Sequence, residues 1–144
     1  MDNVNIKLYL GAEGIKQSYE ASLKADAVDI VCLSYNYAAV IGDYFDKVYA
    51  PRLYGSTIKT REILPDTEEN RNGAAKKDGR KNQVRFLKTK QPSESDLMLF
   101  GDRVFLVSYN TNAPFALEIT DPELVGGFKN QYEALWESLS DTLR

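Results

Sequence analysis

The first 25 residues show two successive periodicities of apolar side chains. From residue 5 to residue 10 apolar and polar side chains alternate, with Ile6, Leu8 and Leu10 on one side, which is typical of a half-buried strand. Between residues 14 and 25 the apolar groups instead recur in steps of four, which indicates an amphipathic helix. A strand followed directly by a helix is therefore predicted for the start of the chain.

The alternation of strands and helices continues to residue 64. A mostly apolar run over 27–33 predicts a strand buried on both faces of a sheet. Helical spacing extends over 37–49, and Pro51 is expected to end or kink this helix because proline lacks the N–H that the previous turn needs. A further strand is predicted over 57–64. This order favours an α/β fold in which helices cover a sheet with parallel strands.

The second half of the chain contains four more strand patterns. Short strands are predicted over 83–88 and 115–120, and two others, 96–100 and 103–109, flank the dipeptide Gly101-Asp102. A two-residue connection of this composition is typical of a β-hairpin turn whose twist matches that of the strands. The sequence therefore predicts a β-hairpin over 96–109.

The last pattern is that of a long amphipathic helix. Asp121 and Pro122 have the composition of a helix start, with a carboxylate cap and a proline in the first turn. Apolar residues then recur at helical spacing from Phe128 to Leu139 and include the single tryptophan, Trp136. We expect Trp136 to cover the core of the domain.

Residues 66–82 interrupt these patterns. No apolar side chain larger than Ala74 and Ala75 occurs there, so the segment has little surface to bury against the entropy cost of ordering. We predict one domain over residues 1–144, with an exposed, charged and mobile insertion at 66–82 that contains at most a frayed helical turn.

Composition excludes several kinds of chemistry. The 144 residues contain no histidine, which removes Ser–His and Cys–His nucleophile pairs, imidazole metal sites and imidazole acid–base steps. The one cysteine, Cys32, permits no internal disulfide and is expected to be a small buried apolar group. A net charge of −3 disfavours nucleic-acid binding by the whole surface. No metal or other cofactor is predicted, and the absence of a signal peptide or membrane-length apolar segment favours the cytoplasm and no membrane contact.

A basic segment leaves one nucleic-acid hypothesis open. Residues 76–90 carry seven lysines and arginines against one aspartate, and cation density governs non-specific affinity for phosphates. The alternative is a solvated loop beside the outer side of a strand, since the stacking aromatics of single-strand binders are missing. The candidate contacts are Lys76, Lys77, Arg80, Lys81 and Arg85.

Polar side chains at strand ends suggest a small-molecule site. Ser34 and Tyr35 follow the apolar strand at 27–33, and Ser108 and Asn110 follow the strand at 103–109. Ligand sites of α/β sheets form at such ends, so the two groups are expected either to share one crevice or to be only turns and caps. Two carboxylates belong to the same hypothesis, Asp102 and Glu118. The alternation of Phe115, Leu117 and Ile119 does not require a carboxylate at position 118. An enzyme that uses carboxylates alone is a third hypothesis.

The order of these elements resembles the effector domain of TrmB-like transcriptional regulators, a domain similar to the phospholipase D fold. The resemblance rests on residues 6–15 followed by Tyr19-Glu20, the end of a helix at 47–52 before the strand at 58–65, the strand at 84–87, the hairpin at 97–107, Glu118, and the helix from Phe128 to Trp136. It implies a mixed sheet with helices on both faces, and a homodimer.

The same resemblance bears on activity. Catalytic relatives carry a histidine, a lysine two residues later, an aspartate and a later glutamate, and placing their aspartate on Asp102 puts Ser95 and Leu97 at the histidine and lysine positions. Ser108 and Asn110 match a following polar segment, and Glu118 matches the later acid. The resemblance therefore implies a non-enzymatic domain that senses a small effector such as a sugar or mediates dimerisation. It would contact DNA only through a winged helix-turn-helix domain that this chain lacks. The alternative is a catalytically inactive relative of the nucleases that binds nucleic acid through residues 76–90.

Overall fold

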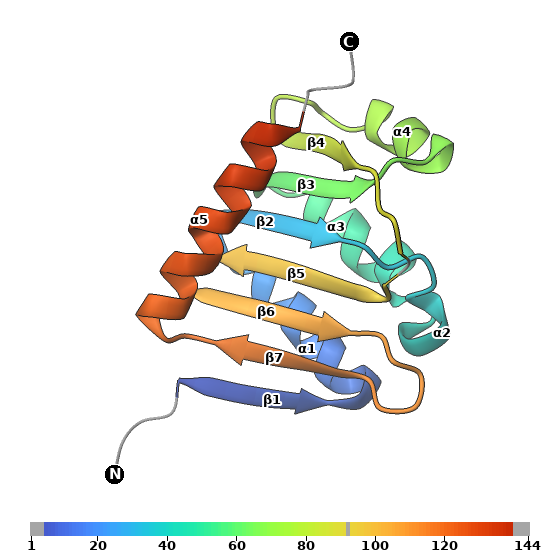
Figure 1. Cartoon of the computed structure of the whole chain (residues 1–144). Coiled ribbons are helices and arrows are strands. Elements are labelled where there is room, and N and C mark those ends of the chain that lie inside the picture. The colour runs from blue at the N-terminus through green and yellow to red at the C-terminus, as the bar shows by residue number, and fades with distance from the viewer. Residues whose placement is uncertain (1–4, 92, 140–144) are drawn as a thin grey trace.

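Seven strands form one mixed sheet in the computed structural model, which describes residues 5–91 and 93–139 (Figure 1). The strand order is β1-β7-β6-β5-β2-β3-β4. The strands are β1 (Ile6–Leu10), β2 (Ala27–Cys32), β3 (Lys59–Pro65), β4 (Asn82–Leu87), β5 (Ser95–Phe100), β6 (Arg103–Ser108) and β7 (Phe115–Ile119). The helices are α1 (Gly11–Ser22), α2 (Ala38–Ile41), the π-helical η1 (Phe45–Tyr49), α3 (Ala50–Tyr54), α4 (Glu68–Ala75) and α5 (Pro122–Ser138).

The sheet combines a parallel and an antiparallel half. Strands β2, β3 and β4 pair in parallel, while β5, β6, β7 and β1 join them through antiparallel pairs. The β5–β6 connection is the predicted two-residue turn, and Gly101 adopts a φ of 57°, the positive value that such a turn needs at its first central residue. The predicted mixed α/β sheet is thus confirmed.

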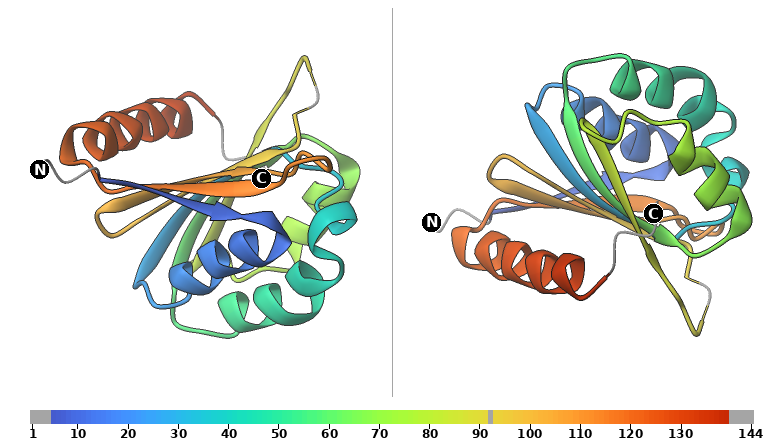
Figure 2. Two further views of the ribbon diagram at one scale, coloured as in Figure 1. Left: turned by 90° about the horizontal axis from the view of Figure 1, so that it is seen from below. Right: turned by 90° about the horizontal axis from the view of Figure 1, so that it is seen from above.

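Helices cover both faces of the sheet, as Figure 2 shows. Helices α1 to α4 lie on one face, called here the helix-rich face, and α5 crosses the other, called here the α5 face. Two buried apolar clusters match these layers. The first includes Ile15, Tyr19 and Phe105, and the second includes Tyr132 and Trp136, which is 6% exposed. The prediction that Trp136 covers the core is confirmed. No helix of the described ranges is long and apolar enough to span a membrane.

The predicted single helix over 37–49 is wrong, because glycine divides it. Gly42 ends α2 with a φ of 61°, and the chain restarts as η1, a π-helix that leads into α3. Pro51 lies in the first turn of α3, where its missing N–H costs little, instead of ending the helix.

The prediction that 66–82 contains at most a frayed helical turn is wrong, although more than half of its residues are exposed. The segment contains the helix α4, whose first turn is capped by the Thr67 hydroxyl, which accepts a hydrogen bond from the Asn70 N–H at 3.1 Å. Ala74 is 2% exposed and packs with Val84 and Phe86 of β4. The helix thus buries a single small side chain against the sheet, which composition alone does not reveal.

Strand β1 presents its apolar side to solvent. The predicted alternation is present, but Ile6, Leu8 and Leu10 are 47%, 53% and 71% exposed, and Tyr9 instead packs on Phe105 at the helix-rich face. The β1 strand lies at the edge of the sheet, and its only strand neighbour among the described residues is β7. Ile6, Leu8 and Leu10 form an exposed apolar patch that the half-buried strand pattern does not predict.

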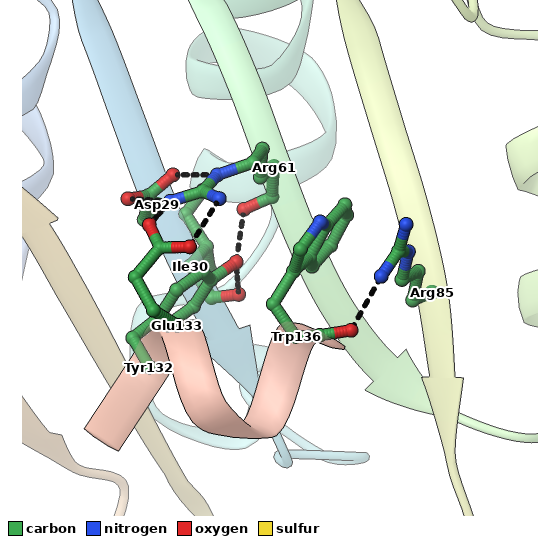
Figure 3. Close-up of polar contacts among 7 residues, drawn as sticks. All are labelled: Asp29, Ile30, Arg61, Arg85, Tyr132, Glu133 and Trp136. Atoms are coloured by element: carbon green, nitrogen blue, oxygen red, sulfur yellow. Dashed lines mark hydrogen bonds and ion pairs between the residues drawn. The ribbon is translucent and has the colours of Figure 1, made fainter. Parts of the chain in front are cut away.

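Helix α5 is attached to the sheet by a cluster of charges and rings, called here the α5 clasp (Figure 3). Arg61 of β3 donates to both carboxylate oxygens of Asp29 at 2.8 Å and pairs with Glu133 of α5. Its guanidinium lies 5.1 Å from the ring centre of Tyr132 and 5.4 Å from that of Trp136. On the other side of Trp136, Arg85 stacks on the indole and donates to the Trp136 carbonyl, so the clasp fixes the C-terminal part of α5 to β2, β3 and β4.

Candidate functional site

The two polar groups that follow β2 and β6 lie at one edge of the sheet but on opposite faces. Strand β5 runs between them, since Ser95 pairs with Ser108 and its carbonyl accepts from the Leu33 N–H. The Ser34 side chain turns to the helix-rich face, whereas Ser108 lies on the α5 face. The predicted shared crevice therefore does not form. Side chains alternate between the two faces along each strand, and this alternation places Ser34, after β2, on one face and Ser108, at the end of β6, on the other.

On the helix-rich face, Ser34 belongs to a buried network around Asp96. The Asp96 carboxylate accepts from the Ser34 hydroxyl at 2.8 Å and from the Tyr19 hydroxyl at 2.6 Å, and Tyr19 also hydrogen-bonds to the Tyr109 hydroxyl. Burial raises the pKa of Asp96 above its ordinary value, although the hydrogen bonds from Tyr19 and Ser34 oppose this shift. Tyr109, between the predicted residues Ser108 and Asn110, is the side chain of its segment that reaches this network.

A cavity of about 320 Å³ lies next to this network, between the η1–α3 segment and α4. We call it the carboxylate cavity. Its lining comprises aromatic rings, four carboxylates and one lysine among the described residues: Tyr19, Ile30, Cys32, Ser34, Tyr37, Phe45, Asp46, Ala50, Tyr54, Glu62, Leu64, Pro65, Glu69, Asn70, Gly73, Ala74, Lys77 and Asp96. Cys32 is half-buried, packs against the apolar core of the helix-rich face and also lines this cavity, and burial raises the pKa of its thiol.

The inner wall of the cavity holds a second buried carboxylate, Glu62 of β3, which is 3% exposed. It accepts from the Tyr54 hydroxyl at 2.6 Å and from the Lys77 ammonium at 2.8 Å. Burial, followed by the charge of Glu62, raises the pKa of Tyr54 far above its ordinary value, so Tyr54 stays a neutral donor. Sequence analysis missed Glu62 and Asp96. Asp96 lies in phase with the buried Met98 and Phe100 of its strand, and a carboxylate at such a position is a signal that the sequence analysis did not use.

A second hollow lies on the α5 face and is called here the apolar groove. Its lining is Val31, Leu33, Ser95, Asp96, Leu97, Leu106, Val107, Ser108, Phe115 and Leu117. Ser95 and Leu97, which the resemblance places at the histidine and lysine positions of catalytic relatives, both line it, and Ser108 faces the same groove.

The other predicted ligand residues do not join either hollow. Tyr35 is 53% exposed, and Asp102 lies in the exposed β5–β6 turn. Asn110 accepts from the Asn112 N–H within its own turn. Glu118 is buried, at 9% exposure, and faces the helix-rich side, where Arg103 pairs with it at 3.0 Å and the Tyr9 hydroxyl donates to it. These contacts satisfy the Glu118 carboxylate within the protein.

The five candidate nucleic-acid contacts do not form one surface. Lys77 pairs with Glu62 inside the carboxylate cavity, and the Lys81 ammonium donates to the carbonyls of Tyr54 and Ser56. Arg85 belongs to the α5 clasp on the opposite face of the sheet. Only Lys76 and Arg80 are left as exposed side chains among the five, so a basic patch made of all five is wrong.

Comparisons with known proteins bear on the fold. No family model and no curated protein sequence matches the chain. Among solved structures, NucT from Helicobacter pylori superposes with a TM-score of 0.69 at 16% identity and covers 94% of this chain and 98% of its own. Nuc from Salmonella typhimurium, a phospholipase D family member, gives 0.62 at 12% identity, over 94% and 96%. The chain has a phospholipase D-like fold.

A third structural neighbour is TrmBL2, described as an archaeal chromatin protein with a novel mode of DNA binding. It superposes with a TM-score of 0.63 at 17% identity over 96% of this chain, which spans about half of TrmBL2, or 54% of its length. Since a likeness at such low identity establishes the fold alone, the fold expectation is confirmed, and the regulator assignment belongs to the proposal below.

Proposed function

We propose that this chain is a non-catalytic binding domain of the TrmB-like type, which senses a small molecule and pairs with a second copy of itself. The observation that carries the proposal is the chemistry of the apolar groove. At the positions of the family nucleophile and its cationic partner, Ser95 and Leu97 supply neither an imidazole nor an ammonium group. Phosphodiester cleavage through a phosphohistidine has no nucleophile there.

The carboxylate cavity supports the sensing role. It lies on the face opposite the groove, has the size of a small-ligand pocket, and combines apolar walls with a few buried polar groups around Glu62 and Asp96. Ser34, predicted as a ligand residue, reaches its lining together with Asp96.

Pairing is supported by the apolar side of β1. Leu8 and Leu10 line a further hollow that includes Phe115, and Phe115 also lines the apolar groove, so the two surfaces are continuous. Continuous exposed apolar surfaces of this kind mark interaction sites. A second copy is the occupant we propose, because the resemblance to TrmB-like effector domains implies homodimers.

Light scattering across a concentration series tests the pairing. We expect a dimer that Leu10→Lys dissociates, since the ammonium group would be buried without a partner in the interface. Val48→Lys is the matched control, because Val48 is also an exposed apolar residue, at 41%, but lies in η1 on the other face. A monomeric parent protein, or equal effects of the two variants, would contradict the pairing.

Thermal-shift screening with sugars, phosphates, nucleotides and amines tests the sensing role. A ligand of the cavity should raise the unfolding temperature of the parent protein. Gly73→Leu should abolish the shift, since Gly73 lines the cavity and a side chain there enters open space. Gly73→Ala is the control and should keep it. A screen without any stabilising compound would leave pairing as the only role.

Nucleic-acid binding is the second candidate function, favoured by the DNA-binding description of TrmBL2. It would use Lys76 and Arg80, the exposed members of the basic segment. Binding to a DNA duplex should then fall by orders of magnitude between about 50 and 200 mM salt and weaken in Lys76→Ala. Binding that is absent at low salt would exclude this function.

A further inference from the structure

The carboxylate cavity has an unbalanced charge. Among its described lining residues, Asp46 and Glu69 lie at exposed positions, Glu62 and Asp96 are buried, and Lys77 is the one basic residue. The Lys77 ammonium is already bound to Glu62 at 2.8 Å. The lining therefore carries more acidic groups than its own cation can balance, and an anionic ligand entering it would be repelled.

The cavity already holds one positive charge, the ammonium group of Lys77. The Lys77 ammonium lies 4.5 Å from the centre of the Tyr54 ring while it contacts the Glu62 carboxylate. A carboxylate on one side and an aromatic face on the other is the environment in which a partly desolvated ammonium group is stabilised. The cavity thus contains one ammonium site, occupied by its own lysine.

A similar combination of a carboxylate and aromatic rings occurs elsewhere in the lining. Lys77, the one basic residue of the described lining, pairs with Glu62 and not with this second carboxylate. The Tyr37 hydroxyl donates to Asp46 at 2.9 Å, which orients the carboxylate, and the Tyr37 ring lies 5.0 Å from that of Phe45. Asp46 and both rings line the cavity. This arrangement offers a carboxylate and aromatic faces to a second cation that would come from solution.

We infer that the ligand of the carboxylate cavity is a small organic cation, an amine whose ammonium group binds Asp46 beside the rings of Tyr37 and Phe45. The inference rests on the proposed function of this cavity as a small-molecule site and specifies its ligand class. The apolar part of the ligand would contact the aliphatic wall near Leu64 and Ala50. Neutral sugars lack the charge that Asp46 would bind, and phosphorylated ligands carry the wrong one.

Calorimetric titration of the whole chain tests the inference with putrescine and agmatine as cations, glucose as a neutral ligand, and glucose 6-phosphate as an anion. We expect the cations to bind, and Asp46→Asn to weaken their binding at least about tenfold, which corresponds to about 1.4 kcal/mol for the lost charge. The amide keeps an oxygen that can accept from Tyr37. Asp43→Asn is the matched control, since Asp43 is an exposed aspartate near the same helix that pairs with Lys47 outside the cavity, and it should bind as the parent does.

The outcomes separate this inference from the proposed function. If glucose or glucose 6-phosphate binds and Gly73→Leu abolishes the binding while the amines do not bind, the cavity is a ligand site but the cation inference is overturned. If the amines bind equally well to Asp46→Asn and to Asp43→Asn, the inference is overturned as well, because binding then reflects only the net charge of −3. If no probe binds, this ligand class fails, and the wider screen alone decides the sensing role.

Discussion

Replacing Arg61 with methionine tests whether the α5 clasp holds the C-terminal helix to the sheet. Methionine keeps most of the length of the arginine stem but removes the guanidinium, which binds both oxygens of Asp29 and lies over the rings of Tyr132 and Trp136 (Figure 3). Asp29 hydrogen-bonds hold the pKa of Arg61 above its ordinary value, with Glu133 adding to the effect, so the charge is present at every accessible pH.

The expected cost follows from the burial of these groups. The Arg61 and Asp29 side chains are each 27% exposed, so removal of the guanidinium leaves a partly buried carboxylate without its cation, at about 1–3 kcal/mol. Loss of the two ring contacts adds about 0.5–1 kcal/mol each. We expect a decrease of about 2–5 kcal/mol in the free energy of unfolding, and a midpoint of thermal unfolding lower by about 10 °C.

Urea unfolding followed by far-ultraviolet circular dichroism measures this cost without depending on Trp136 fluorescence, which the substitution itself would change. Arg52→Met is the matched control. Arg52 also binds a carboxylate through two hydrogen bonds, but this pair with Glu20 is 53% and 43% exposed, and exposed ion pairs contribute little to stability because solvent screens them. Equal costs for the two variants would refute the reasoning, because the clasp would then be no more than a surface ion pair.

Two further substitutions test the buried network and helix α4. Because burial raises the Asp96 pKa, the folded chain binds this proton more tightly than the unfolded chain. The contribution to stability is therefore full below the unfolded pKa and is lost as the pH rises through the folded value. Asp96→Asn should lack this loss, so its stability relative to the parent should increase from pH 4 to pH 7 in urea titrations; a pH-independent difference would contradict the assignment. Thr67→Ala should cost about 1 kcal/mol by removing the α4 cap, whereas Thr67→Ser should cost much less, and equal midpoints for both would disprove the cap.

The strands and the last helix could be predicted because their signals are local. The hairpin at Gly101-Asp102 and the cap at Asp121 depend on backbone conformations that particular residues favour, and both form as predicted. The division of the 37–49 segment at Gly42 could not be predicted with the same certainty, since glycine is tolerated inside helices and its positive φ depends on how η1 packs on the sheet. Helix α4 could not be predicted either. Its buried residue is Ala74, and a single methyl group produces no apolar pattern in the sequence.

For the candidate site, the types of side chain and their spatial arrangement have different origins. The sequence by itself determined that imidazole chemistry is impossible and that polar groups follow the strands ending near Ser34 and Ser108. Only the tertiary structure decided which of them meet, because strand order and side-chain alternation send Ser108 into the apolar groove and bring Tyr19, Ser34 and Tyr109 around Asp96. Composition and local pattern fix the types of side chain and the element each belongs to. Which side chains share a cavity depends on contacts between residues far apart in sequence, and those arise only when the sheet is assembled.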